Sequence, residues 1–426
     1  MLYQLAHLPC FSSWQPQRHR CATKTAITQK NSTTALFWRQ IMHAALRTAT
    51  FTDSVIRRMT RVCLQYDAIN LSQGFPDFDP PKELTERLAQ VATTGPHQYA
   101  ITWGAQNLRE AIAAKIEHFS GQKVDPNSEL VVTCGSTEAM MAAVLATVNA
   151  GEKVAIFSPF YENYGADTIL CDATPIYVPL RPPVFDFDPE ALEQAFKDGA
   201  KALILCNPSN PCGKVFTREE LQTIAAIVQK YDAFVITDEV YEHILYKPYE
   251  HTYMATLPGM KERTLVCNSF SKTYSITGWR LGYVQGPAHI IEAVRKVHDF
   301  LTVGAAAPLQ EALIAGLQLP DSYYEELQET YTRKRELFCN GLTALGLDYY
   351  KPQGAYYVLV DIGKFGYESD LKFCEDLAAK VGVGAVPGSS FFREDVNNYI
   401  RFHFAKKEET LKAALERLQK INILQR

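Results

Sequence analysis

Residues 201–241 read KALILCNPSNPCGKVFTREELQTIAAIVQKYDAFVITDEVY. The apolar run Leu203–Cys206 predicts a short buried strand. Residues 217–220 match a capping box, in which a threonine and a glutamate three positions later start a helix, here over Leu221–Tyr231. Phe234–Thr237 predicts a second buried strand. A strand, a helix and a strand in this order are typical of a parallel sheet that is covered by helices.

The same alternation extends on both sides of this stretch. Further strands are predicted at Leu130–Thr133, Val154–Phe157, Leu265–Cys267 and Leu281–Val284, and further helices at Leu84–Val91, Leu108–Phe119, Thr137–Val148 and after Asp188-Pro189. After Pro308, long helical stretches are followed by predicted strands at Tyr356–Val360, Val383–Val386 and Tyr399–Phe404. The predicted fold class is therefore α/β, with a mostly parallel sheet sandwiched by helices in a large domain (residues 80–310). A smaller α+β domain is predicted from residues 53–79 and 311–426.

Composition excludes several classes of protein. The chain has 426 residues, of which 47% are hydrophobic and 21% charged, as in ordinary globular proteins. A net charge of −4 gives no bulk basicity for nucleic acid. No apolar run reaches the roughly 18–20 residues that a membrane span needs. The ten cysteines form no Cys-x-x-Cys pair, which argues against zinc and disulfides and favours a reducing compartment, hence the cytoplasm.

Residues 1–52 differ from the rest of the chain. They contain six Lys or Arg residues and no Asp or Glu, without sustained apolar periodicity. Such a segment resembles a transit peptide, which would indicate an organelle. A non-native upstream extension, with Met42 as the working start, explains the composition equally well. In either case we expect a non-globular N-terminal extension that takes no part in the fold.

The segment most indicative of chemistry is Ser269-Phe270-Ser271-Lys272-Thr273, directly after a predicted strand. Near the end of a buried strand an ammonium group is poorly solvated, so its pKa falls. A lysine of this kind can form a Schiff base with a carbonyl compound. The alternative is an ordinary surface lysine at the end of a strand.

Asp238 and Tyr241 follow another predicted strand, in the sequence Thr237-Asp238-Glu239-Val240-Tyr241. Open α/β sheets bind ligands beyond the carboxyl ends of their strands, so both side chains are placed at a binding crevice. Asp238 could hold a proton on a ring nitrogen, and Tyr241 could hydrogen-bond to a phenolate oxygen. Alternatively, Asp238 caps the turn that follows.

Two more segments lie at predicted strand ends. Gly135-Ser136-Thr137 opens a helix, whose free N–H groups and positive dipole suit a phosphate, unless Ser136 only caps the helix. Asn207–Gly213 contains two Asn-Pro steps, which force a sharp turn that could be functional or an ordinary connection. A phosphate cradle, a carboxylate, a phenolate partner and a reactive lysine together match the needs of pyridoxal 5′-phosphate.

At this point the chain resembles the class I aminotransferases of the fold-type I pyridoxal-phosphate enzymes, within them the kynurenine/glutamine/methionine aminotransferase branch. The resemblance runs from about Phe51 to the C-terminus. It is carried by residues 69–78 (INLSQGFPDF), Asn207–Gly213, Thr237–Tyr241, Ser269–Lys272 with Gly278–Arg280, and Tyr399-Ile400-Arg401-Phe402.

The resemblance implies a role for each matching residue. Lys272 would form the Schiff base and shuttle the proton, Asp238 would pair with the pyridine nitrogen, and Tyr241 would contact the phenolic oxygen. The other implied cofactor contacts are Asn210 at the phenolic oxygen, Tyr161 stacked on the ring, and Ser269, Arg280 and the backbone of Gly135, Ser136 and Thr137 at the phosphate. The implied contacts to the substrate α-carboxylate are Arg401, Asn210 and Gly74. Tyr99 would reach the phosphate of a neighbouring subunit, which implies a homodimer.

The implied reaction moves an amino group from an L-amino acid to a 2-oxo acid by a ping-pong mechanism. No second arginine for a side-chain carboxylate can be placed by motif, and aromatic surroundings favour neutral donors, aromatic or sulfur-containing. These surroundings are expected to be Phe75, Phe78, Tyr161, Tyr164 and His298. A β-lyase acting on cysteine S-conjugates is the alternative enzyme. An effector-sensing regulator built on the same fold is a remoter alternative, because residues 1–52 are too short for a winged helix.

Overall fold

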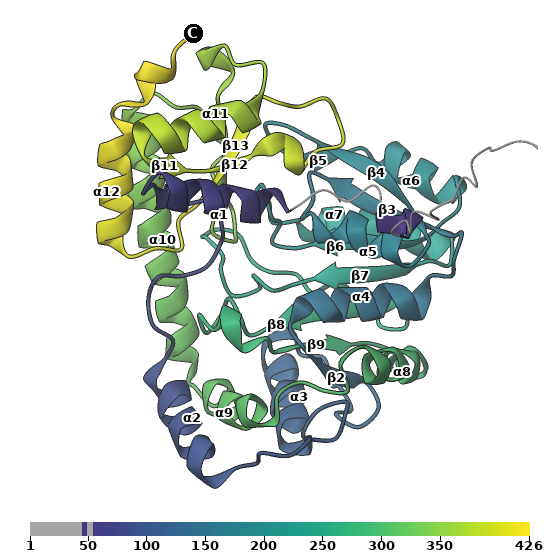
Figure 1. Cartoon of the computed structure of the whole chain (residues 1–426). Coiled ribbons are helices and arrows are strands. Elements are labelled where there is room, and N and C mark those ends of the chain that lie inside the picture. The colour runs from purple at the N-terminus through teal and green to yellow at the C-terminus, as the bar shows by residue number, and fades with distance from the viewer. Residues whose placement is uncertain (1–44, 49–53) are drawn as a thin grey trace, which may run out of the picture. The chain divides into compact units, whose positions relative to one another are not determined.

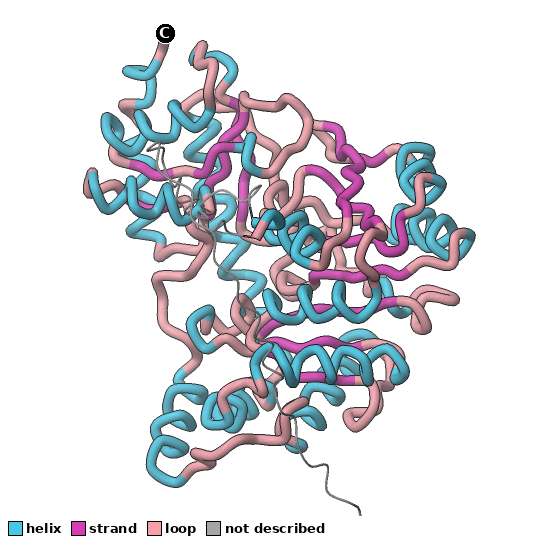
Figure 2. Tube along the Cα trace, turned by 45° about the vertical axis from the view of Figure 1, so that its right-hand side comes forward, coloured by secondary structure: helices cyan, strands magenta, loops and turns pink. Residues whose placement is uncertain are grey.

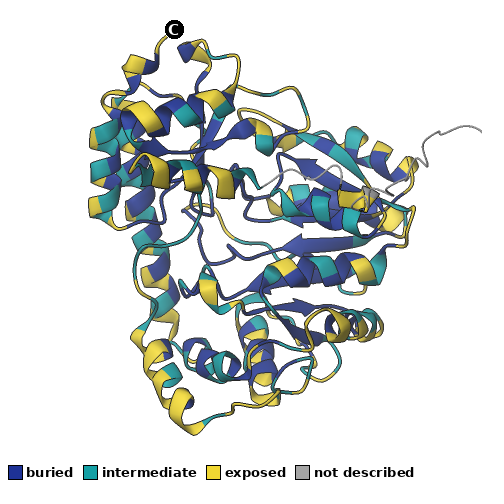
Figure 3. Cartoon of the chain, viewed as in Figure 1, coloured by how far each residue is buried: buried dark blue, intermediate teal, exposed yellow. Residues whose placement is uncertain are grey.

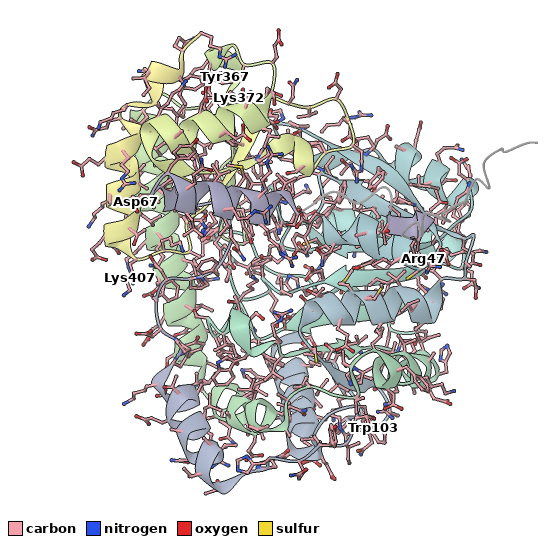
Figure 4. All side chains as sticks on the ribbon, viewed as in Figure 1. Arg47, Asp67, Trp103, Tyr367, Lys372 and Lys407 are labelled. Carbon is pink, nitrogen blue, oxygen red and sulfur yellow. The ribbon has the colours of Figure 1, made fainter. Side chains whose placement is uncertain are left out.

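The structure, a computed structural model, describes residues 45–48 and 54–426. The expectations for residues 1–44 and 49–53 lie outside the described residues. Residues Ala45–Arg426 form one compact unit, so the predicted division between a large and a small domain stays a prediction. At the start of this unit, Arg47 forms a surface ion pair with Asp172 at 3.3 Å; Figure 4 labels Arg47.

The central feature is an eight-stranded sheet with the strand order β2-β9-β8-β7-β6-β3-β4-β5 (Figure 1). Its strands are β2 (Leu130–Thr133), β3 (Lys153–Ser158), β4 (Thr174–Arg181), β5 (Asp186–Phe187), β6 (Ala200–Cys206), β7 (Phe234–Asp238), β8 (Thr264–Ser269) and β9 (Gly282–Gln285). Within this sheet, β9 and β5 run antiparallel to their neighbours and the other paired strands run parallel. The predicted mostly parallel sheet is confirmed.

Helices cover both faces of this sheet, as Figure 2 shows for the cyan segments beside the magenta strands. One face packs against α4 (Ser136–Thr147), α5 (Asn163–Leu170) and α8 (Ala288–Thr302), and the other against α6 (Pro189–Lys197) and α7 (Arg218–Lys230). Successive side chains of β6 go to opposite cores: Ile204 joins the first, and Leu203 and Leu205 join the second. This alternation explains why the strands are apolar throughout.

A second, three-stranded sheet has the order β10-β13-β12 and is antiparallel. Its strands are β10 (Tyr357–Asp361), β12 (Val386–Pro387) and β13 (Tyr399–His403). The predicted single strand Val383–Val386 is wrong: β11 (Val383–Gly384) leaves this sheet and pairs in parallel with β1 (Ile69–Asn70). The helices of this region are α1 (Val55–Gln65), α10 (Asp321–Ala344), α11 (Asp370–Asp376) and α12 (Glu408–Leu418).

The remaining long helices are α2 (Lys82–Thr94), α3 (Gln106–Ser120) and α9 (Ala307–Leu317). Figure 3 shows the central strands of the large sheet mostly in dark blue, because most of their residues are buried, whereas β4 and β5 at one edge are mostly intermediate or exposed and the outer faces of the helices are yellow. Among the described residues, no helix combines the length and the apolar character that crossing a membrane requires. Parallel strands β6, β7 and β8 end at Cys206, Asp238 and Ser269, so the loops that follow them leave the same edge of the sheet.

Candidate active site

A cavity of about 830 Å³ lies at this edge of the sheet. Most of the predicted site residues line it: Gly74, Ser136, Thr137, Tyr161, Asn210, Asp238, Tyr241, Ser269, Lys272, Arg280 and Arg401. Gly135 lies beside the wall, where a Cβ atom would overlap the guanidinium of Arg280. Tyr99 is not among the lining residues; its side chain is 88% exposed on the surface of this subunit.

Lys272 lies in the turn that follows β8. Its Nζ is 3.4 Å from the carbonyl oxygen of Gly74, which accepts its hydrogen bond, and 5.9 Å from the ring centre of Tyr241. Burial lowers the pKa of Lys272 to about 8, although the carboxylate of Asp238 opposes this shift. Lys272 is therefore a half-buried lysine whose amine has a large neutral fraction near pH 8, and the surface-lysine alternative is wrong.

Asp238 is the last residue of β7, and burial raises the pKa of its carboxyl group. The hydroxyl of Tyr164 donates to its Oδ2 at 2.7 Å. Its Oδ1 accepts a long hydrogen bond of 3.4 Å from the backbone N–H of Val240. Asp238 therefore does cap the following turn, as the alternative predicted, but with one oxygen only. The carboxyl group of Asp238 is buried and fixed in orientation, so it is suited to pair with one buried positive charge.

The start of α4 lies at one edge of the cavity. Gly135, at φ +78°, is the residue before the helix, and no side chain caps it, so the alternative that Ser136 acts only as a cap is wrong. Among the described residues, the first N–H groups of α4 thus have no side-chain partner, and they lie beside Arg280, itself at φ +54°. Free N–H groups, a helix dipole and a guanidinium together suit a phosphate.

Arg401, on β13, is 1% exposed, and it contacts segments that are far apart in the sequence. Its Nη1 donates to Asn210 Oδ1 at 2.7 Å and its Nη2 to the carbonyl oxygen of Ser72 at 3.0 Å. Its Nε is buried without a hydrogen-bond partner in the described part of the chain. Unsatisfied donors on a buried cation are costly, so this guanidinium is suited to receive an anion such as a carboxylate.

Several lining residues were not predicted from the sequence. Tyr357 and the exposed Arg57 belong to no local motif that we recognised. Asp167, one helical turn after Tyr164, is buried with Oδ2 unpartnered among described atoms, and burial raises its pKa to about 8. The spacing of Tyr164 and Asp167 on one face of α5 was the available signal.

The expected aromatic surroundings are only partly correct. Phe75, Tyr161 and Tyr164 line the cavity. Phe78 instead packs against Tyr331, and His298 is buried beside the cavity, 2.6 Å from the carboxylate of Glu138. Glu138 lines the cavity, whereas its partner His298 is not among the lining residues and lies in the layer behind them.

A comparison with protein families shows which family this chain belongs to. Residues 66–418 match the family model of the aminotransferases of class I and II. The chain belongs to this family. It therefore is an aminotransferase, and the predicted fold-type I architecture and enzyme class are confirmed.

The relatives of this aminotransferase include enzymes with several substrates. It is 38% identical to the methionine aminotransferase of Escherichia coli over 86% of this chain and 96% of that one. It is 34% identical to human kynurenine–oxoglutarate transaminase 1, over 84% and 94% of the two chains. The solved structure of N-succinyldiaminopimelate aminotransferase from Mycobacterium tuberculosis superposes with a TM-score of 0.87 at 35% identity, covering 89% and 100%. These relatives are named as aminotransferases or transaminases, and the match covers nearly their whole length. This supports an enzyme and not a regulator.

Aminotransferases of this family use pyridoxal 5′-phosphate. The described residues fit this cofactor. The cavity holds an amine without a carboxylate ion pair among described residues (Lys272), a rigid buried carboxyl (Asp238) and an uncapped helix start at Ser136. These groups would supply a covalent anchor, a partner for the ring nitrogen and donors for the phosphate.

Proposed function

We propose that this aminotransferase moves the amino group of a neutral L-amino acid, aromatic or sulfur-containing, to a 2-oxo acid in two half-reactions. The observation that carries the proposal is the shared cavity of Lys272, Asp238 and Arg401: a half-buried amine, a buried carboxyl and a buried guanidinium with a free donor. An amine that moves protons and a cation that holds a carboxylate are what an α-amino acid requires.

The proposed cofactor contacts use residues that line the cavity. Ser269, Arg280 and the start of α4 would bind the phosphate, and Tyr161 would stack on the ring. Asn210 and Tyr241 hydrogen-bond to the phenolic oxygen. Asp238 holds a proton on the ring nitrogen, because a buried carboxylate favours a positive charge beside it. The Tyr164 hydroxyl keeps the carboxyl of Asp238 in this orientation through its bond to Oδ2.

The proton transfer falls to Lys272. Bound pyridoxal phosphate supplies a carbonyl carbon that takes up amines and a ring that withdraws electrons from the substrate α-carbon. The neutral Nζ of Lys272 accepts the α-proton and returns it, and its lowered pKa of about 8 places it near the pH at which it acts. Arg401, with Asn210 and the backbone at Gly74, holds the α-carboxylate so that the Cα–H bond faces Nζ.

A neutral donor is supported by the charges at the mouth of the cavity. Arg57 is exposed, so its attraction for a distal carboxylate is screened by water. The carboxylate of Glu162 also lines this region and accepts the hydroxyl of Ser54 at 2.5 Å. The two charges offset each other, so neither a dicarboxylic nor a dibasic donor is favoured.

A panel of amino donors tests this function. Without any 2-oxo acid, each active donor should yield one equivalent of its oxo acid per subunit, and added 2-oxo acid should restore turnover. We expect methionine, glutamine, phenylalanine and kynurenine to be better donors than aspartate. Pyruvate and ammonia formed from a cysteine S-conjugate without an acceptor would instead reveal β-elimination, and a best donor with a side-chain carboxylate would contradict the proposal.

We also propose a homodimer, because apolar side chains stand exposed on two segments beside the cavity. Tyr99 is 88% and Phe300 91% exposed, and Ile101, Leu301 and Val303 are about half exposed. Gly304 approaches the backbone of Thr102, so the two segments adjoin, and Leu301 reaches the cavity wall. Exposed apolar patches of this kind mark protein interfaces.

If the protein is a homodimer, sedimentation velocity at micromolar concentration should give the mass of two chains. Phe300→Asp should shift the protein towards monomer and weaken cofactor binding, because Tyr99 of the other subunit would no longer reach the phosphate. Ile423→Asp, a matched change of another exposed apolar residue far along the chain, should alter neither. A fully active monomeric protein would contradict the dimer.

A further inference from the structure

Tyr357, on β10, connects the two halves of the proposed site. Its side chain is buried and lines the cavity, and its hydroxyl oxygen lies 2.9 Å from that of Tyr241, so the two phenols share one hydrogen bond. A Cβ atom at position 74 would overlap the Tyr357 hydroxyl, so the glycine there leaves the room that this side chain occupies.

The direction of this shared hydrogen bond matters. If Tyr357 donates, the oxygen of Tyr241 is the acceptor and the Tyr241 proton is free to point elsewhere. If Tyr241 donates, its proton is consumed inside the pair and its hydroxyl cannot also donate to a ligand. The two arrangements therefore give Tyr241 opposite capacities toward anything bound in the cavity.

Charges around the pair favour donation by Tyr357. The guanidinium carbon of Arg401 lies 4.3 Å from the centre of the Tyr357 ring, close enough to attract electron density from the phenol. Burial raises the pKa of both phenols, and at Tyr357 the nearby charge of Arg401 opposes this rise. The more acidic phenol is the better hydrogen-bond donor.

We propose that Tyr357 is a positioning residue that donates its hydroxyl proton to Tyr241 and thereby aims the Tyr241 O–H at the phenolic oxygen of pyridoxal phosphate. This inference rests on the proposed contact between Tyr241 and that oxygen. In this arrangement Arg401, Tyr357 and Tyr241 act in series. The charge of Arg401, on the substrate side, favours donation by Tyr357, and this donation determines which way the Tyr241 hydroxyl points on the cofactor side.

The test is the pH titration of the visible absorbance of the bound cofactor, which follows the proton on the nitrogen that joins it to Lys272. A donor at the phenolic oxygen stabilises the negative charge there and weakens the hold of that oxygen on this proton. Tyr357→Phe should therefore raise the titration midpoint by up to roughly one pH unit, because the Tyr241 hydroxyl remains but loses the hydrogen bond that orients and polarises it. A fall in the midpoint would show that Tyr241 is the donor, and no change would show a purely structural role; either result overturns the inference.

Three further variants separate the possible failures. Tyr241→Phe should raise the midpoint too, and Tyr241→Phe with Tyr357→Phe should match Tyr241→Phe alone, because Tyr357 acts on the cofactor only through the Tyr241 hydroxyl. If Tyr241→Phe leaves the midpoint unchanged, the proposed contact of Tyr241 fails and the inference with it. If only Tyr357→Phe has no effect, the inference alone fails. Gly74→Ala, whose Cβ would displace the Tyr357 hydroxyl, should reproduce the shift if Tyr357→Phe folds poorly.

Tyr331→Phe is the matched control. Tyr331 is fully buried, its ring stacks on Tyr356 at 5.6 Å, and its hydroxyl has no hydrogen-bond partner among the described residues. Removing that hydroxyl should leave the midpoint unchanged. An equal shift in Tyr331→Phe and Tyr357→Phe would mean that loosened packing moves the midpoint, which would overturn the inference.

Discussion

Lys272→Ala should retain pyridoxal phosphate but lose transamination by a factor of about a thousand or more, since one substitution removes the covalent anchor and the proton carrier together. The phosphate contacts around Arg280 and the start of α4 do not involve Lys272, so non-covalent binding should persist. The measurements are the rate of each half-reaction and the dissociation constant of the cofactor. Wild-type turnover by the variant would contradict the assignment.

Borohydride reduction followed by peptide mapping identifies the labelled lysine directly. Lys406 is an informative competitor, because burial lowers its pKa as well, yet its ammonium lies over the ring of Phe75 at 4.3 Å and it is not among the cavity-lining residues. The label is expected on Lys272 only. A label on Lys406 would show that a lowered pKa, without the surrounding cavity, selects the reactive amine.

Arg401→Lys should lower kcat/KM for every α-amino acid by about 2–4 kcal/mol, the cost of losing a buried, charged hydrogen-bonded pair. A guanidinium has five N–H donors, of which Asn210 and Ser72 engage two, so donors remain for both oxygens of a carboxylate. A lysine ammonium is a point charge without this planar pair of donors. Cofactor binding should be unchanged.

Amines without a carboxylate are the discriminating substrates for this variant. Their slow reaction should be equal in Arg401→Lys and the wild type, because the clamp is not used. Arg393→Lys is the matched control: Arg393 also lies over aromatic rings, those of Phe160 and Tyr177 at 5.1 Å, but does not line the cavity. An equal loss for amines and amino acids would mean that Arg401 supports the structure and that the clamp lies elsewhere.

The sequence predicted the elements whose cause is local. Buried parallel strands are continuous apolar runs, so β2 was predicted at its observed bounds Leu130–Thr133. Strand β6 was predicted with its observed end at Cys206, but it begins at Ala200 and not at Leu203. Strand β4 was missed because Pro175 and Pro179 interrupt its pattern. The division of 383–386 between two sheets depends on pairing with Ile69, more than 300 positions away, which no local pattern contains.

The same distinction holds for the site. Lys272, Asp238 and Ser136 directly follow or end strands, so their placement was predictable from strand ends alone. Tyr357 and Arg57 were not, because their positions depend on how β10 and α1 pack beside the large sheet. The contact between Tyr164 and Asp238 likewise arises from the packing of α5 on the sheet and not from a motif.

The clamp around Arg401 has a consequence for biosynthesis. Its parts are Ser72, Asn210 and β13, so the contact spans 329 positions of the chain and cannot form until the last of them has been translated. The loops that we propose to bind the cofactor phosphate are complete about 120 residues earlier, at Arg280, and the last strand of the large sheet ends at Gln285. Because a chain is synthesised from its N-terminus, all of these parts exist before the clamp that would select an amino acid can form. Competence for substrate is therefore acquired last, which makes amino-acid binding a sensitive reporter of complete folding.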